Sequence, residues 1–308
     1  MERSVILSFL HVVLLLLFAP LVPGVINRTK SFMGGRKGPP LLQAYYDISK
    51  LLRKQTARSA TTTWIFFAGA AVTVSTAVAA TLFLPVGDHS PVISFTGDML
   101  VFVYLFALAR FFITTAAMDT GSAFEGMGAS REVTFSALAE PALLLGLLSL
   151  ARLSGSLHLS EMLAVGKSGA WEKASASVVL IIVGWFILVL AENSRVPFDD
   201  PNTHLELTMI HEAMVLDHGG PGLGFLFYGA ALKLTLFSAL LGSLILPVRS
   251  GMQWIDTGAT LVGILIVAIA TGLVESSMAR LRLVRVPQLL ITATLLVAFA
   301  VILLLRNE

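Results

Sequence analysis

The segment from Glu192 to Glu212 holds the densest group of side chains that could exchange protons. Six acids or imidazoles fall within its last fourteen residues: Asp199, Asp200, His204, Glu206, His211 and Glu212. Arg195 lies just before them, and apolar stretches (Val-Pro-Phe and Leu-Thr-Met-Ile) separate the charges. A fully solvated loop does not need these apolar stretches, so we predict a partly buried, protonatable funnel.

A metal site is a weaker interpretation of the same segment. Asp200 followed by Pro201 is typical of a helix start, with a capping acceptor and a proline in the first turn. His204 and His211 then share a helical face, but at 1.5 Å per residue they lie about 10 Å apart, too far for one ion. The HExxH spacing is absent. We therefore expect this chain to bind no metal.

Three further charged residues fall inside long apolar stretches: Arg110, Glu140 and Lys233. A carboxylate in the hydrocarbon core costs several kcal/mol unless it faces protein or water, so Glu140 is a candidate for a proton path. The alternative is an ion pair between Glu140 and Arg110 or Lys233 that only orders the helices.

The composition predicts the elements that position these residues. Of 308 residues, 56% are apolar, 13% are charged and none is cysteine, and the mean hydropathy is +0.85. Soluble domains carry about 25% charged residues, so we predict an all-α polytopic membrane protein. Without cysteine the chain cannot ligate an iron–sulfur cluster or a nickel–iron centre through thiolates. A net charge of +2 does not suggest a nucleic-acid partner.

Eight segments are long and apolar enough to cross a bilayer, and together they predict one membrane domain over residues 1–308. We expect the first to be a span rather than a cleaved signal peptide, because it is long and lacks a clean cleavage site. The eight predicted spans are 5–25, 64–84, 100–118, 133–150, 174–191, 223–246, 257–274 and 287–305.

The basic residues predict how these spans are oriented. The loops 26–63, 119–132, 192–222 and 275–286 hold thirteen Lys and Arg residues, whereas the other loops and both tails hold six. The positive-inside rule then places the first group of loops in the cytoplasm and both termini outside, in a cell (inner) membrane.

The first cytoplasmic loop contains an amphipathic segment, Leu41–Lys54, with Tyr45 and Ile48 on its apolar face and Asp47 and Lys50 on the other. This pattern predicts a helix that lies in the membrane interface and contacts lipid. The second, 119–132, contains three glycines, but no Lys-Ser/Thr follows them and no strand precedes them, so a phosphate-binding loop is not indicated.

Several motifs, in order and on one side of the membrane, resemble a known family. A-E-N-S-R-V-P-F-D over Ala191–Asp199 resembles the A-E-x-x-R-x-P-F-D stretch of respiratory complex I subunit 1, the membrane subunit beside the quinone chamber. The continuation Asp200–Asp217, together with the motifs between Asp119 and Pro141, is similar to the corresponding subunit of membrane-bound nickel–iron hydrogenases of the formate hydrogenlyase and hydrogenase-4 type. Gly35–Pro39 matches the first-loop motif of the family.

This resemblance implies a non-catalytic subunit of an oxidoreductase complex. It implies an anchor for a hydrophilic redox arm and coupling of electron transfer to H⁺ or Na⁺ movement. The implied partners are a hydrogenase large subunit and a small iron–sulfur subunit, which carry the Ni–Fe and Fe–S centres, and antiporter-like membrane subunits. This chain would bind no cofactor.

The resemblance also implies roles for particular residues. The implied acidic funnel and proton path contain Glu140, Glu192, Arg195, Asp199, Asp200, His204, Glu206, His211, Glu212, Lys233 and Glu275. The residues implied to face the redox arm are Arg36, Lys37, Asp119, Glu125 and Arg131.

Two other functions stay open. The chain could be the quinone-site subunit of a complex I-type dehydrogenase, in which case a quinone-site inhibitor binds. It could instead be a stand-alone cation transporter, in which case this polypeptide alone transports ions in liposomes; the absence of an internal repeat weakens that alternative.

Overall fold

The computed structural model describes residues 2–56, 61–87, 90–164, 171, 174–199, 209–248 and 250–306, with only the backbone described for residues 2–8. These residues contain helices and no strands, and eight of the helical stretches are long and apolar enough to span a membrane. The predicted all-α membrane protein is thereby confirmed. The long helices are α1 (Glu2–Phe18), α2 (Leu21–Met33), α4 (Trp64–Thr81), α5 (Asp98–Asp119), α6 (Ala123–Ser154), α9 (Ser175–Glu192), α11 (Gly220–Ile245), α12 (Gln253–Ser277) and α13 (Val286–Arg306).

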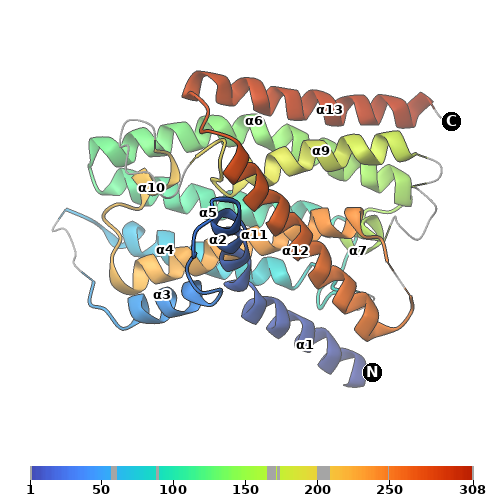
Figure 1. The fold of residues 1–308 in the computed structure, drawn as a ribbon, viewed down its shortest axis with the longest axis horizontal. Helices are drawn as coiled ribbons and strands as arrows, with labels where there is room; N and C mark the ends of the chain where they lie inside the picture. Colours follow the sequence, from blue (N-terminus) through green and yellow to red (C-terminus); the bar gives the residue numbers. More distant parts are fainter. Residues whose placement is uncertain are drawn as a thin grey trace.

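The two chain ends lie at the same end of the helix bundle, as an even number of spans requires (Figure 1). The short helix α7 (Leu159–Leu163) lies at that end too, whereas α3 (Gln43–Leu52) and α10 (His211–Met214) lie at the opposite end. A short 3-10 turn, η2 (Leu283–Arg285), precedes α13. The loops predicted to be basic therefore gather at the end that carries α3 and α10.

The first span departs from its predicted range of 5–25, because it is broken at Ala19–Pro20 and continues as α2 to Met33. Proline cannot donate the hydrogen bond that a continuous helix needs at this position. Just beyond the break, Gly24 lies against the segment that precedes α3. A Cβ at this position would be 2.1 Å from the Leu41 carbonyl oxygen. The absence of a side chain at Gly24 lets the segment before α3 pack against α2.

Helix α3 forms within the predicted amphipathic segment Leu41–Lys54, between the first two spans. It packs on α11, where Gly224 lies against the Leu51 and Leu52 side chains. The Tyr45 hydroxyl donates to the backbone carbonyl of Leu17, near the break between α1 and α2. Helix α3 is thereby fixed beside the end of the bundle.

Helix α6 is longer than its predicted range of 133–150 and starts at Ala123, so most of the predicted loop 119–132 is helical. Gly128, which falls in the predicted loop 119–132, is helical, and a Cβ there would meet Ile210, Ala213 and Met214. Contact with the α10 region favours the helix over a turn here. As a result, Arg131 and Glu132 project from a regular helix.

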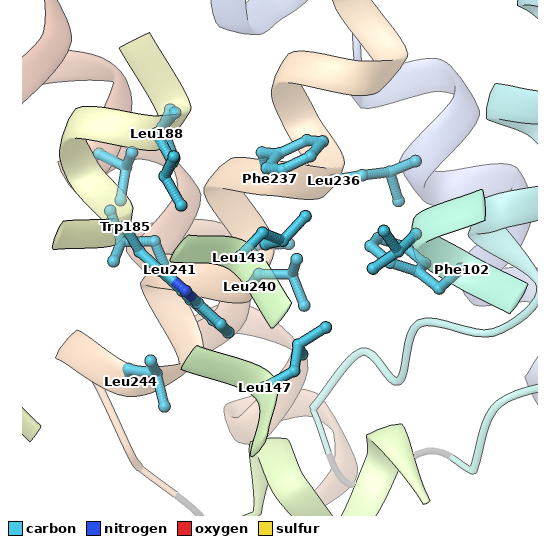
Figure 2. Close-up of a cluster of buried hydrophobic side chains, with 14 of the residues drawn as sticks. Phe102, Leu143, Leu147, Trp185, Leu188, Leu236, Phe237, Leu240, Leu241 and Leu244 are labelled. Atoms are coloured by element: carbon cyan, nitrogen blue, oxygen red, sulfur yellow. The ribbon is translucent and has the colours of Figure 1, made fainter. Parts of the chain in front are cut away.

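The bundle packs around α11, which is more buried than any other candidate span. Figure 2 shows side chains from α5, α6 and α9 packed against it in the main apolar cluster. The labelled residues are Phe102, Leu143, Leu147, Trp185, Leu188, Leu236, Phe237, Leu240, Leu241 and Leu244. Lipid tails are as apolar as these residues, so close packing rather than transfer from water holds the helices together. Helix α11 also carries Lys233, which this packing positions inside the bundle.

Candidate functional site

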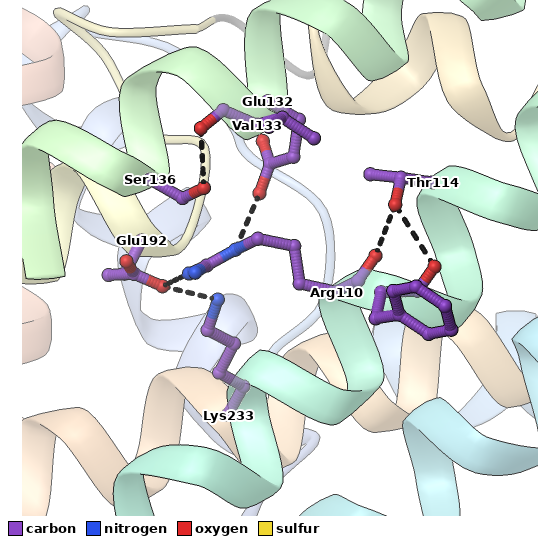
Figure 3. A network of polar contacts seen from close by, with 8 residues as sticks. Arg110, Thr114, Glu132, Val133, Ser136, Glu192 and Lys233 are labelled. Carbon is purple, nitrogen blue, oxygen red and sulfur yellow. Dashed lines mark hydrogen bonds and ion pairs between the residues drawn. The ribbon is translucent and has the colours of Figure 1, made fainter.

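Arg110, Glu192 and Lys233 form an ion-pair cluster between α5, α9 and α11 (Figure 3). Glu192 Oε2 lies 2.5 Å from an Arg110 terminal nitrogen and 2.8 Å from Lys233 Nζ. The Glu192 side chain is only 7% exposed. One carboxylate therefore pairs with two cations that approach it from two other helices.

The aromatic rings around Lys233 add to this environment. Lys233 Nζ lies 6.0 Å from the centre of the Phe106 ring and 5.8 Å from that of Phe237. Ring faces attract cations at this range, so the two rings add to the attraction that Glu192 exerts on the ammonium. The sequence offered Glu140 as a partner of Arg110 or Lys233, but both cations pair with Glu192 instead.

Glu132 is a further member of the cluster that sequence reasoning did not select. Its Oε1 lies 3.5 Å from Arg110 Nε, and its side chain is 19% exposed. The signal in the sequence was an acid at the inner end of a predicted span, eight residues before Glu140. Figure 3 shows Glu132 and Glu192 approaching the Arg110 guanidinium group from different helices.

Glu275 anchors a second ion-pair group, at the end of α12. Its carboxylate lies 2.8 Å from Lys30 Nζ on α2 and 3.6 Å from an Arg195 terminal nitrogen. The Glu275 side chain is fully buried. Two of the predicted path residues, Arg195 and Glu275, are thus direct neighbours, whereas Glu275 and Lys233 belong to separate groups.

Asp199 joins three segments that are distant in the sequence. Its Oδ1 accepts a hydrogen bond of 2.7 Å from the Arg280 guanidinium group, and its Oδ2 accepts the backbone N–H groups of Ile210 and His211 at 3.1 Å each. The residue is 1% exposed. Asp199 therefore holds the start of α10 and the loop after α12 at one point.

Glu140 lies on α6, two turns further into the bundle than Glu132. It is half-buried, and no ion pair of 4.0 Å or less joins it to another described residue. Asp200, His204 and Glu206 lie outside the described residues.

A cavity of about 360 Å³ lies between α3, α4, α5 and α11 and is bordered by part of these charged groups. Its charged and imidazole lining comes from Asp47, Arg110, Glu132, Glu192, Arg195, Asp199, His211, Glu212 and Lys233. Apolar residues of α3, α4, α5 and α11 line the remainder, among them Ile48, Ala77, Phe106 and Leu226. The arrangement can hold water next to ionisable groups and can also accept an apolar chain. Within the described ranges, no group of three or more His, Asp or Glu side chains could hold a metal ion.

Three of the residues expected to face a redox arm make contacts inside this chain. Asp119 accepts hydrogen bonds from the Thr63 backbone and hydroxyl at the start of α4. Glu125 is fully buried and accepts the N–H of Asp217, while Arg131 donates to Met209 O. These three residues hold the α4, α6 and α10 segments together.

Arg36 and Lys37, the other two residues expected to face a redox arm, are exposed in the turn after α2.

His218 lies between α10 and α11, outside the candidate spans. Its ring stacks on Phe66 with centres 3.9 Å apart. Burial is the larger cause, and the neighbouring His211 the smaller one, of a pKa of His218 that is lowered to about 4. The imidazole is therefore neutral at physiological pH.

The chain is similar to known membrane subunits of respiratory enzymes. The NADH dehydrogenase family matches residues 5–306. Formate hydrogenlyase subunit 4 of Escherichia coli (strain K12) is 31% identical over 300 residues, covering 93% of this chain and 94% of that protein. Hydrogenase-4 component C of the same organism is 30% identical over 282 residues, or 90% and 88% of the two chains. NADH-ubiquinone oxidoreductase chain 1 of Paracentrotus lividus is 30% identical over 246 residues, or 77% and 73%.

A solved structure has the same fold. A chain of the membrane-bound sulfane sulfur reductase, described as an archaeal respiratory membrane complex, aligns with a TM-score of 0.84 at 22% identity, covering 97% of this chain and 99% of that chain. The family match extends over nearly the whole sequence, and the two hydrogenase relatives cover about nine tenths of it. The chain therefore belongs to the NADH dehydrogenase subunit 1 family and resembles, within it, the hydrogenase-4 and formate hydrogenlyase membrane subunits.

Proposed function

We propose that this chain anchors the hydrophilic redox arm of a membrane-bound nickel–iron hydrogenase and couples its electron transfer to ion movement across the membrane. The two hydrogenase relatives support the type of complex, since their names describe a hydrogenase component and a formate hydrogenlyase subunit. The implied partners are the large subunit and the iron–sulfur subunit, on the cytoplasmic side, and antiporter-like subunits within the membrane. The partners carry the Ni–Fe and Fe–S centres.

The observation that carries the coupling proposal is the cluster of Arg110, Glu132, Glu192 and Lys233 beside the cavity. Charges buried in a membrane protein usually serve ion or proton movement, because a span that only anchors does not need them. The cavity also reaches Arg195 and Asp199, which belong to the loop at the end predicted to face the cytoplasm. A change of charge in a redox arm above this loop can alter proton occupancy below it, since charges interact strongly where water is scarce.

The test separates coupling from attachment. Arg195→Met removes a guanidinium group that faces Glu275, without touching any redox centre. We expect hydrogen turnover in membranes to fall severalfold more than the amount of large subunit retained there. Ser276→Ala is a matched control on the same helix end as Glu275, because its hydroxyl bonds only to its own helix at Gly272 O. If turnover falls only in proportion to retained large subunit, the loop is a docking surface and the coupling proposal is wrong.

A quinone-site subunit is the second candidate, and the partly apolar cavity is the observation that favours it. Apolar residues such as Ile48, Ala77 and Phe106 line it together with charged ones such as Glu192 and Lys233, so it could take a molecule with an apolar tail and a polar ring. A quinone-site inhibitor that inhibits turnover, and loses its effect in Phe106→Trp, would favour this candidate over the hydrogenase subunit. Unchanged turnover at saturating inhibitor would exclude it.

A further inference from the structure

Glu132 is one of four residues that line two cavities, together with Glu192, Ser194 and Asp199. It lines the large cavity of about 360 Å³ and also a small one of about 20 Å³, which is bordered on α6 by Ser136 and Ala139. A volume of that size is enough for one water molecule if polar partners are available, and Ser136, Glu132 and Glu192 all border it. Glu132 can therefore exchange a proton with water in either cavity.

The contact between Glu132 and Arg110 is weak compared with the contacts of Glu192. Arg110 Nε and Glu132 Oε1 are 3.5 Å apart, and Arg110 Nε is buried without a hydrogen-bond partner among the described residues. Glu192 Oε2, in contrast, has two cationic nitrogens within 2.8 Å. The two carboxylates share one guanidinium group but are held by it very unequally.

This inequality determines which carboxylate can change its proton occupancy. Protonating Glu192 would leave Arg110 and Lys233 as buried cations without their common counter-ion, which is strongly unfavourable. Protonating Glu132 removes one long contact, and Arg110 keeps Glu192 as its partner. We propose that Glu132 is the residue that takes up and releases the proton, while Glu192 stays ionised; this inference rests on the proposed function.

The other charges around Glu132 fit this assignment. Arg110 faces it from α5, Glu192 from α9 and, through Glu192, Lys233 from α11. Asp199 is already satisfied by Arg280 and two backbone N–H groups. The remaining charged or imidazole groups of the cavity and of α6 near Glu132 are Asp47, Arg131, Glu140, Arg195, His211 and Glu212.

The proposed step is a simple exchange of one proton with water. A hydronium ion in the large cavity gives its proton to the Glu132 carboxylate, and the protonated carboxyl later gives it to the water site beside Ser136. No other bond forms or breaks. The fixed Glu192 charge offsets one of the two nearby cations, which weakens their repulsion of the incoming proton.

Glu132→Gln tests the assignment in the whole complex reconstituted in vesicles. Proton movement per hydrogen turned over should fall to less than half of the unaltered ratio, while turnover with an uncoupler is retained. Glu132→Asp should keep the ratio with a shifted pH profile. Thr134→Ala, two residues along on the exposed face of α6, is the matched control. An unchanged ratio in Glu132→Gln would overturn the inference.

A second measurement separates this inference from the proposed function. The redox-difference infrared spectrum of the complex should contain a protonated-carboxyl band that is lost in Glu132→Gln and kept in Glu192→Asp, which preserves a carboxylate. A band that persists in Glu132→Gln contradicts the inference. If the unaltered complex moves no protons but the band behaves as expected, the coupling proposal fails while Glu132 remains the exchanging residue.

Discussion

Lys233 Nζ lies 2.8 Å from Glu192 Oε2 although the two residues belong to helices that are separated in the sequence by the whole α10 region. The same oxygen also accepts a hydrogen bond from the guanidinium group of Arg110 on α5. Three spans are thus joined through a single atom inside the bundle. Because α11 is the most buried span, this contact also ties the cluster to the main packing of the molecule.

Replacing Glu192 should destabilise the protein more than replacing either of its partners. Glu192→Gln takes from Lys233 the carboxylate with which it pairs and leaves Arg110 with only its 3.5 Å contact to Glu132. We expect a loss of about 3–5 kcal/mol in the free energy of unfolding. Lys233→Met removes one cation and leaves the Arg110–Glu192 pair, so its effect should be less than half as large. Thermal unfolding of the purified protein in detergent measures both.

The double variant Glu192→Gln with Lys233→Met provides the control for that prediction. Since it also removes the Lys233 ammonium, which loses its carboxylate partner in Glu192→Gln, it should be more stable than Glu192→Gln alone. Additive effects of the two substitutions would show that the charges do not depend on one another, contrary to the geometry of the cluster.

The contact between α11 and α12 depends on two facing glycines. A Cβ at Gly242 would lie 2.7 Å from the backbone carbonyl carbon of Gly263, and neither backbone can move without separating the helices. We expect Gly242→Ala to cost about 1–3 kcal/mol, measured as a lower unfolding temperature in detergent. Gly258→Ala on α12 is the matched control, because nothing lies within 4 Å of a Cβ there. Equal effects at both positions would exclude close packing as the cause.

The sequence was sufficient to predict the spans because a stretch of about 20 apolar residues has few alternatives in a membrane. It did not predict the first ten residues of α6, which are polar and contain glycines typical of turns. That part of the helix depends on distant segments, since Gly128 packs on α10 and Glu125 binds the backbone of Asp217. Local composition contains no signal for such contacts.

The sequence identified most residues of the candidate site but not which of them pair with one another. Arg110, Glu192 and Lys233 were selected as charges at or inside the spans, and the structure brings them together. The alternative partner Glu140 was chosen only because it lies in a neighbouring span, whereas the actual partner depends on how α5, α9 and α11 rotate against each other. Glu132 was missed because its contact with Arg110 likewise depends on how α5 and α6 pack against each other.

The orientation of the chain in the membrane remains a prediction, and two threonines provide a matched test. Thr56 follows α3 at the end predicted to be cytoplasmic, and Thr96 precedes α5 at the opposite end; both are exposed. Because the natural chain has no cysteine, each can be replaced by one in turn. In intact cells a membrane-impermeant thiol reagent should label Thr96→Cys and not Thr56→Cys. The reverse pattern would invert the proposed topology.

His218 should make the stability of the protein depend on pH below neutrality. Its pKa is about 4 in the fold and 6.5 without it, so the unfolded chain binds a proton that the folded chain rejects. Above pH 6.5 His218 is neutral in both states and does not reduce the stability of the fold. As the pH falls from 6.5 toward 4, the free energy of unfolding should decrease by on the order of 3 kcal/mol, because only the unfolded chain binds the proton. In His218→Phe, which keeps a ring against Phe66, the unfolding temperature in detergent should fall less over this pH range. Parallel pH profiles for the two proteins would show that His218 is not the titrating group.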